Sequence, residues 1–333
     1  MSDLQTGAQN AICDCLQVQS TDRVVIVSDE ATWEIGQALF DEVSKVTDAV
    51  RILKIENYGA RPLKDFPSQL RQDIEGFSPT VSIYAAQGQA GELENFRFKL
   101  IDLLHHRFRC RHAHMINITR EIMRDGMSVD HNLLYEITQK VYELVCGARE
   151  IKVASKKGTD FIAKFDPQLK WISSHGKIRH GEPWQNLPGT ETYTCPADVN
   201  GMVVAEVVGD FFSEKYGYLK VPLTVHIRDG YVWEVESENK ELEQEFKEYI
   251  FTSPLGNRVG EFAIGTNVGL THFIGNLLQD EKFPGVHLAF GHPYPKETGA
   301  NWDSPRHVDI IPTEVDIWVD GKQIMKDGKF VIE

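Results

Sequence analysis

The chain has 333 residues, with 35 lysines and arginines against 49 aspartates and glutamates, and a formal net charge of −14 at pH 7. Such an acidic protein repels nucleic-acid phosphates and anionic lipid headgroups, so we expect neither nucleic acid nor a membrane as a partner. The first residues lack the basic flank and apolar core of a secretory signal, and we expect a cytoplasmic protein. The five cysteines are scattered without a Cys-x-x-Cys pair, which excludes a disulfide framework and a thiolate zinc site.

The N-terminal half alternates strand patterns with helix patterns. Short apolar runs, typical of buried strands, occupy residues 24–27, 50–53 and 81–84. Apolar residues spaced along one helical face occur over residues 31–46, 91–106 and 132–146. Strands that alternate with helices favour a parallel sheet with flanking helices, so we predict an α/β domain over residues 1–151.

The C-terminal half has a different composition, richer in glycine, threonine, proline and aromatic residues. Strand patterns occupy residues 159–165, 201–208, 223–228 and 231–235. Asp-Gly pairs beginning at positions 229, 320 and 327 predict tight turns between strands. Residues 240–251 form the one clear amphipathic helix pattern. Because the chain is too long for one compact domain, we predict a second, mostly β domain over residues 152–333.

Histidines and carboxylates recur in the C-terminal half in an arrangement that suits a metal site. His307 and Asp309 are two positions apart, so in a strand their side chains share a face. Glu261 opens an apolar run and Glu191 begins another strand-like segment. A carboxylate next to a core is costly unless a cation meets it. Each residue alone is more often an ordinary surface or hydrogen-bonded group, but the joint pattern, with His287, favours a divalent-metal site.

The kind of metal follows from the ligand types. Two histidines and three carboxylates suit zinc, cobalt or manganese better than a thiolate-binding metal. Three carboxylates and a bridging hydroxide would also neutralise two divalent ions. A pair of ions activates water at neutral pH while polarising a carbonyl group, so we expect one or two divalent ions and a hydrolytic enzyme.

The same segments resemble the thermophilic-type metalloaminopeptidase family, the family of aminopeptidase T and aminopeptidase S, over residues 113–331. The resemblance rests on the following motifs: Asn186-Leu187-Pro188-x-x-Glu191, Val259-Gly260-Glu261, His287-Leu288-Ala289-Phe290-Gly291 with Tyr294, His307-Val308-Asp309, and the tail from Val319 to Val331. It implies the following metal ligands: Glu191, Glu261, His287, His307 and Asp309. It also implies catalytic roles for Tyr294 and Glu191, with the Tyr294 phenol donating a hydrogen bond to the oxyanion of a tetrahedral intermediate.

The resemblance further implies a homodimer that removes N-terminal amino acids from small peptides or cleaves a related small amide. An alternative comes from a related branch, an iron-dependent dioxygenase that opens 2,5-dihydroxypyridine rings with a single iron(II). In that branch a histidine stands at the position of Glu261, while the closing His-x-Asp pair is kept. Only 20 positions separate His287 from His307, so the loop that shapes the substrate pocket is short. Glu261 is the reason to prefer the hydrolase.

Some other residues could also carry chemistry. His112 and His114, with His131, could form a second metal site, but no carboxylate stands beside them at ligand spacing, and we expect them to form hydrogen bonds instead. Cys195 follows Glu191 closely without an identifiable partner histidine, so cysteine catalysis ranks below the metal site. Trp302 is expected to serve in packing.

Overall fold

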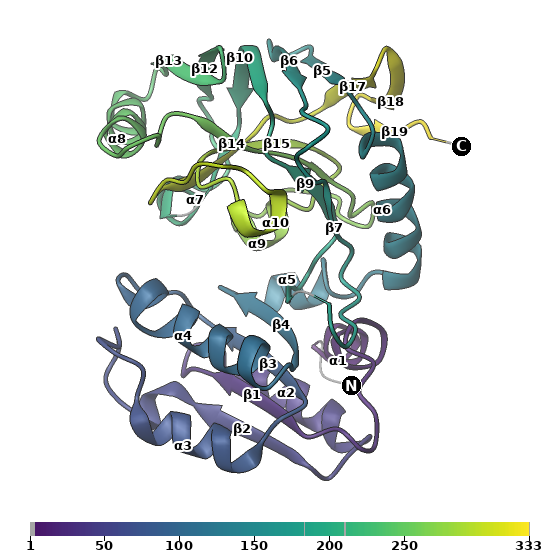
Figure 1. Cartoon of the computed structure of the whole chain (residues 1–333), viewed down its shortest axis with the longest axis vertical. Helices are drawn as coiled ribbons and strands as arrows, with labels where there is room; N and C mark the ends of the chain where they lie inside the picture. The colour runs from purple at the N-terminus through teal and green to yellow at the C-terminus, as the bar shows by residue number, and fades with distance from the viewer. Residues whose placement is uncertain (1–3, 183, 210, 333) are drawn as a thin grey trace. The chain divides into compact units, whose positions relative to one another are not determined.

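The structure is a computed structural model that describes residues 4–182, 184–209 and 211–332 (Figure 1). The chain forms two compact units. The first unit comprises Met1–Tyr135 and Gly176–Gly189, and the second comprises Glu136–His175 and Thr190–Glu333. The chain therefore passes between the units within helix α6 (His131–Val145), and a short later segment returns to the first unit. The change in sequence composition predicts a single boundary, between residues 151 and 152.

The first unit, mainly purple to blue in Figure 1, is built on a parallel sheet. Among the described residues, its strands lie in the following order: β2 (Val50–Lys54), β1 (Val24–Ser28), β3 (Val81–Ala86), β4 (Arg111–Ile116) and β8 (Gln185–Asn186). All neighbouring strands pair in parallel. Parallel neighbours need crossover connections, which here contain helices. The predicted N-terminal α/β architecture is confirmed.

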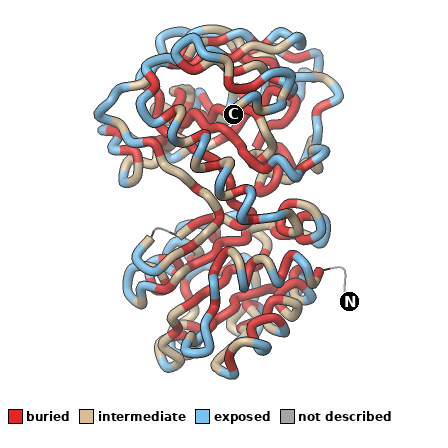
Figure 2. Tube along the Cα trace, turned by 90° about the vertical axis from the view of Figure 1, so that its right-hand side faces the viewer, coloured by how far each residue is buried: buried red, intermediate tan, exposed pale blue. Residues whose placement is uncertain are grey.

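Helices cover the parallel sheet of the first unit. The regular helices are α1 (Gln5–Gln9), α2 (Trp33–Ser44), α3 (Ser68–Phe77), α4 (Phe98–Ile101) and α5 (Arg120–Arg124). On one face, Leu70 and Ile74 of α3 and Leu100 of α4 pack with Val25 and Tyr84 of the strands in one apolar cluster. Figure 2 shows buried residues running along the strands, with exposed residues in the helices' outer turns and in the loops.

The second unit, teal to yellow in Figure 1, contains two antiparallel sheets. Within the described residues, the eight-stranded sheet has the order β13 (Tyr231–Glu236), β12 (Leu223–Arg228), β10 (Asp198–Ala205), β6 (Asp160–Lys164), β5 (Glu150–Ser155), β17 (Val315–Val319), β18 (Lys322–Lys326) and β19 (Lys329–Phe330). The six-stranded sheet has the order β11 (Val207–Val208), β16 (His307–Ile311), β15 (Gly285–Gly291), β14 (Val259–Gly265), β9 (Glu191–Thr194) and β7 (Ile172–Ser174). Its helices among the described residues are the C-terminal part of α6, α7 (Phe211–Tyr216), α8 (Lys240–Phe251), α9 (Leu277–Asp280) and α10 (Pro295–Thr298).

The two antiparallel sheets share one apolar core. Phe161 and Val225 of the eight-stranded sheet belong to the same buried cluster as Phe262, Leu288 and Ile310 of the six-stranded sheet. The rings of Phe161 and Phe262 meet edge to face with centroids 6.4 Å apart. One face of the six-stranded sheet is therefore occupied by the core, and any functional side chain of these strands must stand on the other face.

The three predicted turns are tight connections between antiparallel strands. Asp229-Gly230 joins β12 to β13, Asp320-Gly321 joins β17 to β18, and Asp327-Gly328 joins β18 to β19. Both residues of each pair have positive φ angles, between 45° and 86°. Asp and Gly suit this conformation because glycine has no Cβ and aspartate tolerates the left-handed region.

A search of the described residues for a helix with the length and apolar character required to span a membrane finds none.

Candidate metal centre

The register of the six-stranded sheet places the predicted site residues on one face. Residues directly opposite each other in an antiparallel pair share a face. Ala289 of β15 lies opposite Glu261 of β14 on one side and opposite Asp309 of β16 on the other. His287, two positions before Ala289, therefore shares that face, as does His307, two positions before Asp309.

Glu191 reaches the same face from the neighbouring strand. It is the first residue of β9 and lies opposite Gly265 of β14, four positions from Glu261. The intervening positions on this face carry small residues, including Ala263 and Ala289. Small residues leave room above the sheet for the longer histidine and carboxylate side chains. The alternate positions of the same strands point into the apolar core.

The distances between the two histidines and the carboxylates suit the coordination of a metal ion. Nε2 of His287 lies 3.7 Å from Oε2 of Glu191, 3.7 Å from Oε1 of Glu261 and 3.8 Å from Oδ1 of Asp309. Nε2 of His307 lies 3.5 Å from Oε2 of Glu261 and 3.6 Å from Oδ2 of Asp309. These separations exceed good hydrogen bonds, which are about 2.7–3.2 Å. They match the roughly 3.4 Å between two atoms that each lie about 2.0–2.2 Å from a tetrahedrally coordinated ion.

Burial makes the negative charge of the carboxylates in this cluster costly. The exposed fractions of Glu191, Glu261 and Asp309 are 7%, 5% and 2%. Burial raises the pKa of Asp309, and the nearby carboxylates raise it further against the opposing effect of the histidines. Burial acts to lower the pKa of His287, but Glu261, Asp309 and Glu191 outweigh it and raise that pKa to about 9. The cluster as it stands therefore attracts positive charge.

One oxygen in the cluster has its hydrogen-bonding capacity unused. Oε2 of Glu191 is buried and accepts no hydrogen bond from any described residue, although it faces Nε2 of His287. A buried carboxylate oxygen left in this way costs free energy. A cation coordinated at this position would remove that cost, so the donor set fits a divalent ion.

The orientation of His307 also suits a metal ligand. Its Nδ1 lies 3.1 Å from the carbonyl oxygen of His292 and can donate a hydrogen bond to it. With the proton on Nδ1, Nε2 keeps its lone pair and faces Glu261 and Asp309. Backbone carbonyls commonly orient metal-binding histidines in this way. His307 is 23% exposed, which makes it the most accessible member of the cluster.

Tyr294 stands beside the exposed margin of the cluster. Its hydroxyl oxygen lies 3.5 Å from Nε2 of His307, and its ring packs against that imidazole at 5.2 Å between centroids. Tyr294 has φ 50° and ψ 60°, a left-handed conformation that is costly for a tyrosine. Burial raises the pKa of its phenol well above the ordinary value, and the carboxylates of Glu261 and Asp309 add to this effect. The phenol therefore keeps its proton and can act as a hydrogen-bond donor.

Two charged residues next to the cluster, the buried Lys282 and the half-buried Glu281, were not predicted from the sequence. Lys282 follows helix α9, and its ammonium lies 2.5 Å from Oε1 of Glu191 and 2.6 Å from Oε1 of Glu281. Burial raises the pKa of Glu281, with Lys282 opposing and Glu191 and Asp309 adding to the effect, to about 8. In the sequence, an adjacent glutamate and lysine after a short helix have the appearance of a solvated turn.

The other residues considered from the sequence have structural partners. Nδ1 of His112 lies 2.9 Å from the Ser82 hydroxyl, and His114 stacks on Tyr84 with ring centroids 4.8 Å apart. Neither histidine belongs to a group of potential ligands among the described residues. Burial raises the pKa of Cys195 to about 11, which disfavours a nucleophilic thiolate.

Trp302 and Arg306, which precede the closing His-x-Asp pair, have structural partners. The Arg258 guanidinium lies 4.1 Å from the centroid of the Trp302 ring. The guanidinium of Arg306 donates to the Ser253 hydroxyl at 2.8 Å. These contacts support the expected packing role of Trp302.

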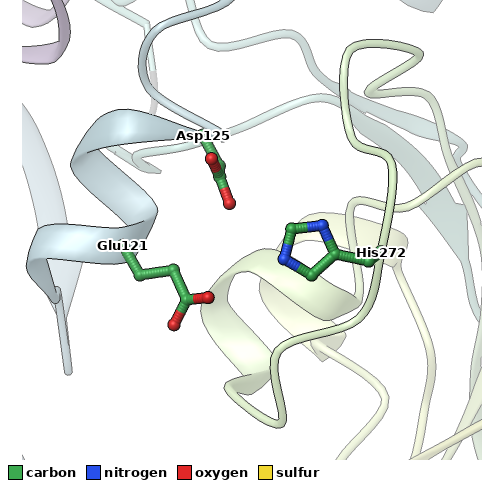
Figure 3. A group of neighbouring side chains, drawn as sticks. All are labelled: Glu121, Asp125 and His272. Atoms are coloured by element: carbon green, nitrogen blue, oxygen red, sulfur yellow. The ribbon is translucent and has the colours of Figure 1, made fainter.

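Figure 3 shows three further ionisable side chains: Glu121 from the first turn of α5, Asp125 directly after α5, and His272 from the loop between β14 and α9. They are exposed or half-buried. Glu121 and Asp125 belong to the first unit and His272 to the second, and we infer no metal site from them.

The geometry agrees with what sequence comparison finds. The profile of the family described as thermophilic metalloprotease (M29) matches residues 134–330, which contain all five predicted ligands and Tyr294. The chain belongs to this family. Metal dependence is therefore a property of the family as well as an inference from the buried cluster. No curated protein matches the sequence significantly.

Two solved structures have the same fold as this member of the M29 family. The structure of 2,5-dihydroxypyridine dioxygenase from Pseudomonas putida KT2440 has a TM-score of 0.71 and 15% sequence identity, covering 100% of this chain and 99% of that chain. Wild-type AmpT from Thermus thermophilus has a TM-score of 0.66 and 15% identity, covering 99% of each chain. At this identity the two structures establish the fold alone.

The cluster predicts the effect of removing one ligand. The His307→Ala substitution should abolish most metal binding, because His307 is one of two proposed imidazole ligands. The far-ultraviolet circular dichroism should stay unchanged. Elemental analysis after dialysis against Zn²⁺ measures the metal content. His226→Ala is the control, since His226 pairs with the exposed Glu236 on the other sheet of the same unit. Metal content equal to that of wild type in His307→Ala would reject His307 as a ligand.

Proposed function

We propose that this chain is a metal-dependent aminopeptidase-like hydrolase that releases N-terminal amino acids from small peptides or cleaves a related small amide. The observation that carries the proposal is a set of five side chains on one sheet face at ligand separations: the buried Glu191, Glu261, His287 and Asp309 and the half-buried His307. Membership of the M29 family supports the same reaction class. The ligand set of imidazole nitrogens and carboxylate oxygens, without a thiolate, favours zinc, cobalt or manganese as the ion.

The chemistry divides between the ion and the side chains of this chain. A divalent ion held by these residues lowers the pKa of water and polarises a carbonyl oxygen. Glu261 and Asp309 each direct one oxygen toward His287 and the other toward His307, so the two carboxylates tie the two histidines into a single site. Strands β14 and β15 are buried on both faces, and β16 is buried from Val308 onward, which holds the proposed ligands in place.

Tyr294 supplies a donor at the accessible side of the site. Because His307 is the most exposed member of the cluster, the substrate carbonyl approaches from its side. The phenol of Tyr294 lies next to Nε2 of His307 and keeps its proton, so it can donate a hydrogen bond to the oxyanion that forms when water attacks the carbonyl carbon.

This role of Tyr294 predicts a defect in turnover rather than in metal binding. Tyr294→Phe removes the hydroxyl and should lower kcat by roughly two to three orders of magnitude, the usual effect of losing one oxyanion donor. Steady-state hydrolysis of aminoacyl amides measures the effect, with metal content determined on the same sample. Tyr216→Phe is the control because the Tyr216 hydroxyl donates to Glu245 near the protein surface. An unchanged kcat in Tyr294→Phe would assign Tyr294 to packing.

One feature of the site favours a second candidate function. His287, His307 and Asp309 form a two-histidine, one-carboxylate set, which is the ligand type of non-haem iron(II) oxygenases. The second candidate is therefore a mononuclear iron dioxygenase acting on a dihydroxylated ring. Glu261 favours the hydrolase because it adds a second carboxylate within 3.7 Å of both histidines. The two-histidine, one-carboxylate set of an iron(II) oxygenase does not require a second carboxylate.

Two variants of Glu261 separate these functions. In the hydrolase, Glu261→Gln removes a negative charge from the site, so both metal affinity and amide hydrolysis should fall strongly. Glu261→His restores a ligand without the charge and should recover metal binding but not hydrolysis. Wild type should hydrolyse aminoacyl amides and consume no oxygen with 2,5-dihydroxypyridine. If wild type instead holds iron, consumes oxygen with such rings and hydrolyses no amide, the dioxygenase is the function.

A further inference from the structure

Lys282 is a buried cation in contact with the candidate metal centre. Its side chain is 0% exposed, and its ammonium bridges the carboxylates of Glu191 and Glu281. Burying a lysine ammonium is costly unless carboxylates surround it. The burial of Lys282 therefore depends on the carboxylates of Glu191 and Glu281, and the lysine is part of the site.

The backbone fixes the position of this lysine. The carbonyl of Lys282 accepts a hydrogen bond from the Asn267 amide at 2.8 Å. Gly265 of β14 allows the close approach, because a Cβ at that position would meet the carbonyl oxygens of Phe283 and Glu281. The segment that carries Lys282 thus lies directly against the strand that carries Glu261, and the ammonium has little freedom to leave the site.

The potential ligands of the second unit form two overlapping groups. One group is Glu261, His287 and Asp309, and the other is Glu191, Glu281 and His287, with the ligand atoms of each group within 4.8 Å of one another. The ammonium of Lys282 is bonded to two of the three members of the second group. A positive charge already stands where the second group would hold an ion.

We infer that Lys282 takes the place of a second metal ion, so that the centre holds one divalent ion. The ion is held by the first group, Glu261, His287 and Asp309, and by His307, whose Nε2 faces the other oxygens of the same two carboxylates. The ammonium supplies the positive charge between Glu191 and Glu281. Glu191 connects the two positions, because Oε1 accepts from Lys282 while Oε2 faces His287. This inference rests on the proposed metal centre. It narrows the expected number of divalent ions per chain from one or two to one.

The test counts ions per chain. Metal-free protein is dialysed against excess Zn²⁺, passed through a desalting column and analysed for zinc and protein. Wild type should retain one ion per chain. Lys282→Gln removes the charge and leaves the carboxylates of Glu191 and Glu281 available, so it should retain two. Lys157→Gln is the matched control, because Lys157 pairs with Glu206 outside the cluster, and it should retain one.

A double variant locates the additional ion. Lys282→Gln combined with Glu281→Gln removes a ligand of the second position and should return the count to one. Two ions in wild type overturn the inference, whether or not the variants fold. One ion in a folded Lys282→Gln protein, judged by circular dichroism, also overturns it, as do two ions in the double variant.

Measuring zinc content and aminoacyl-amide hydrolysis on the same samples distinguishes a failure of this inference from a failure of the proposed function. Two ions in a wild-type protein that hydrolyses aminoacyl amides contradict the inference and leave the hydrolase intact. One ion in a wild-type protein without such activity contradicts the hydrolase and leaves the inference intact. A count of zero in wild type contradicts both.

Discussion

Negative charge concentrated in a buried place is the constraint on which this structure depends. Glu191, Glu261 and Asp309 stand on one sheet face with almost no exposure to water, beside two histidines that are too distant to satisfy them by ordinary hydrogen bonds. Removing a carboxylate from water costs several kcal/mol. Lys282 offsets part of that cost in the folded protein, and in the proposed metal centre a divalent ion would offset the rest.

The antiparallel sandwich explains how the chain can hold such a cluster. Along β14, β15 and β16, one set of alternate residues fills the core with large apolar side chains, and the other set combines the proposed ligands with alanine and glycine. The stability of the fold and the chemistry of the site are therefore assigned to opposite faces of the same strands. Ligands on paired strands are positioned more accurately than ligands on loops.

Local sequence patterns predicted the parts of the structure that local physics determines. The strand runs, the Asp-Gly turns and the shared face of His307 and Asp309 follow from side-chain alternation and backbone preference, and the structure has them. Lys282 and Glu281 could not be predicted, because only the approach of their segment to Gly265 distinguishes a buried ion pair from a solvated turn. The return of residues 176–189 to the first unit likewise depends on tertiary pairing of β8 with β4.

The central claim is that Glu261, His287, His307 and Asp309 hold a divalent ion, and diffraction at a metal absorption edge tests it most directly. Crystals of the protein grown with Zn²⁺ and measured on both sides of the zinc edge locate zinc by its anomalous signal. We expect one peak above the face of β14, β15 and β16, about 2.0–2.2 Å from Nε2 of both histidines and from oxygens of the two carboxylates. An anomalous map with no zinc peak at these four side chains would contradict the account.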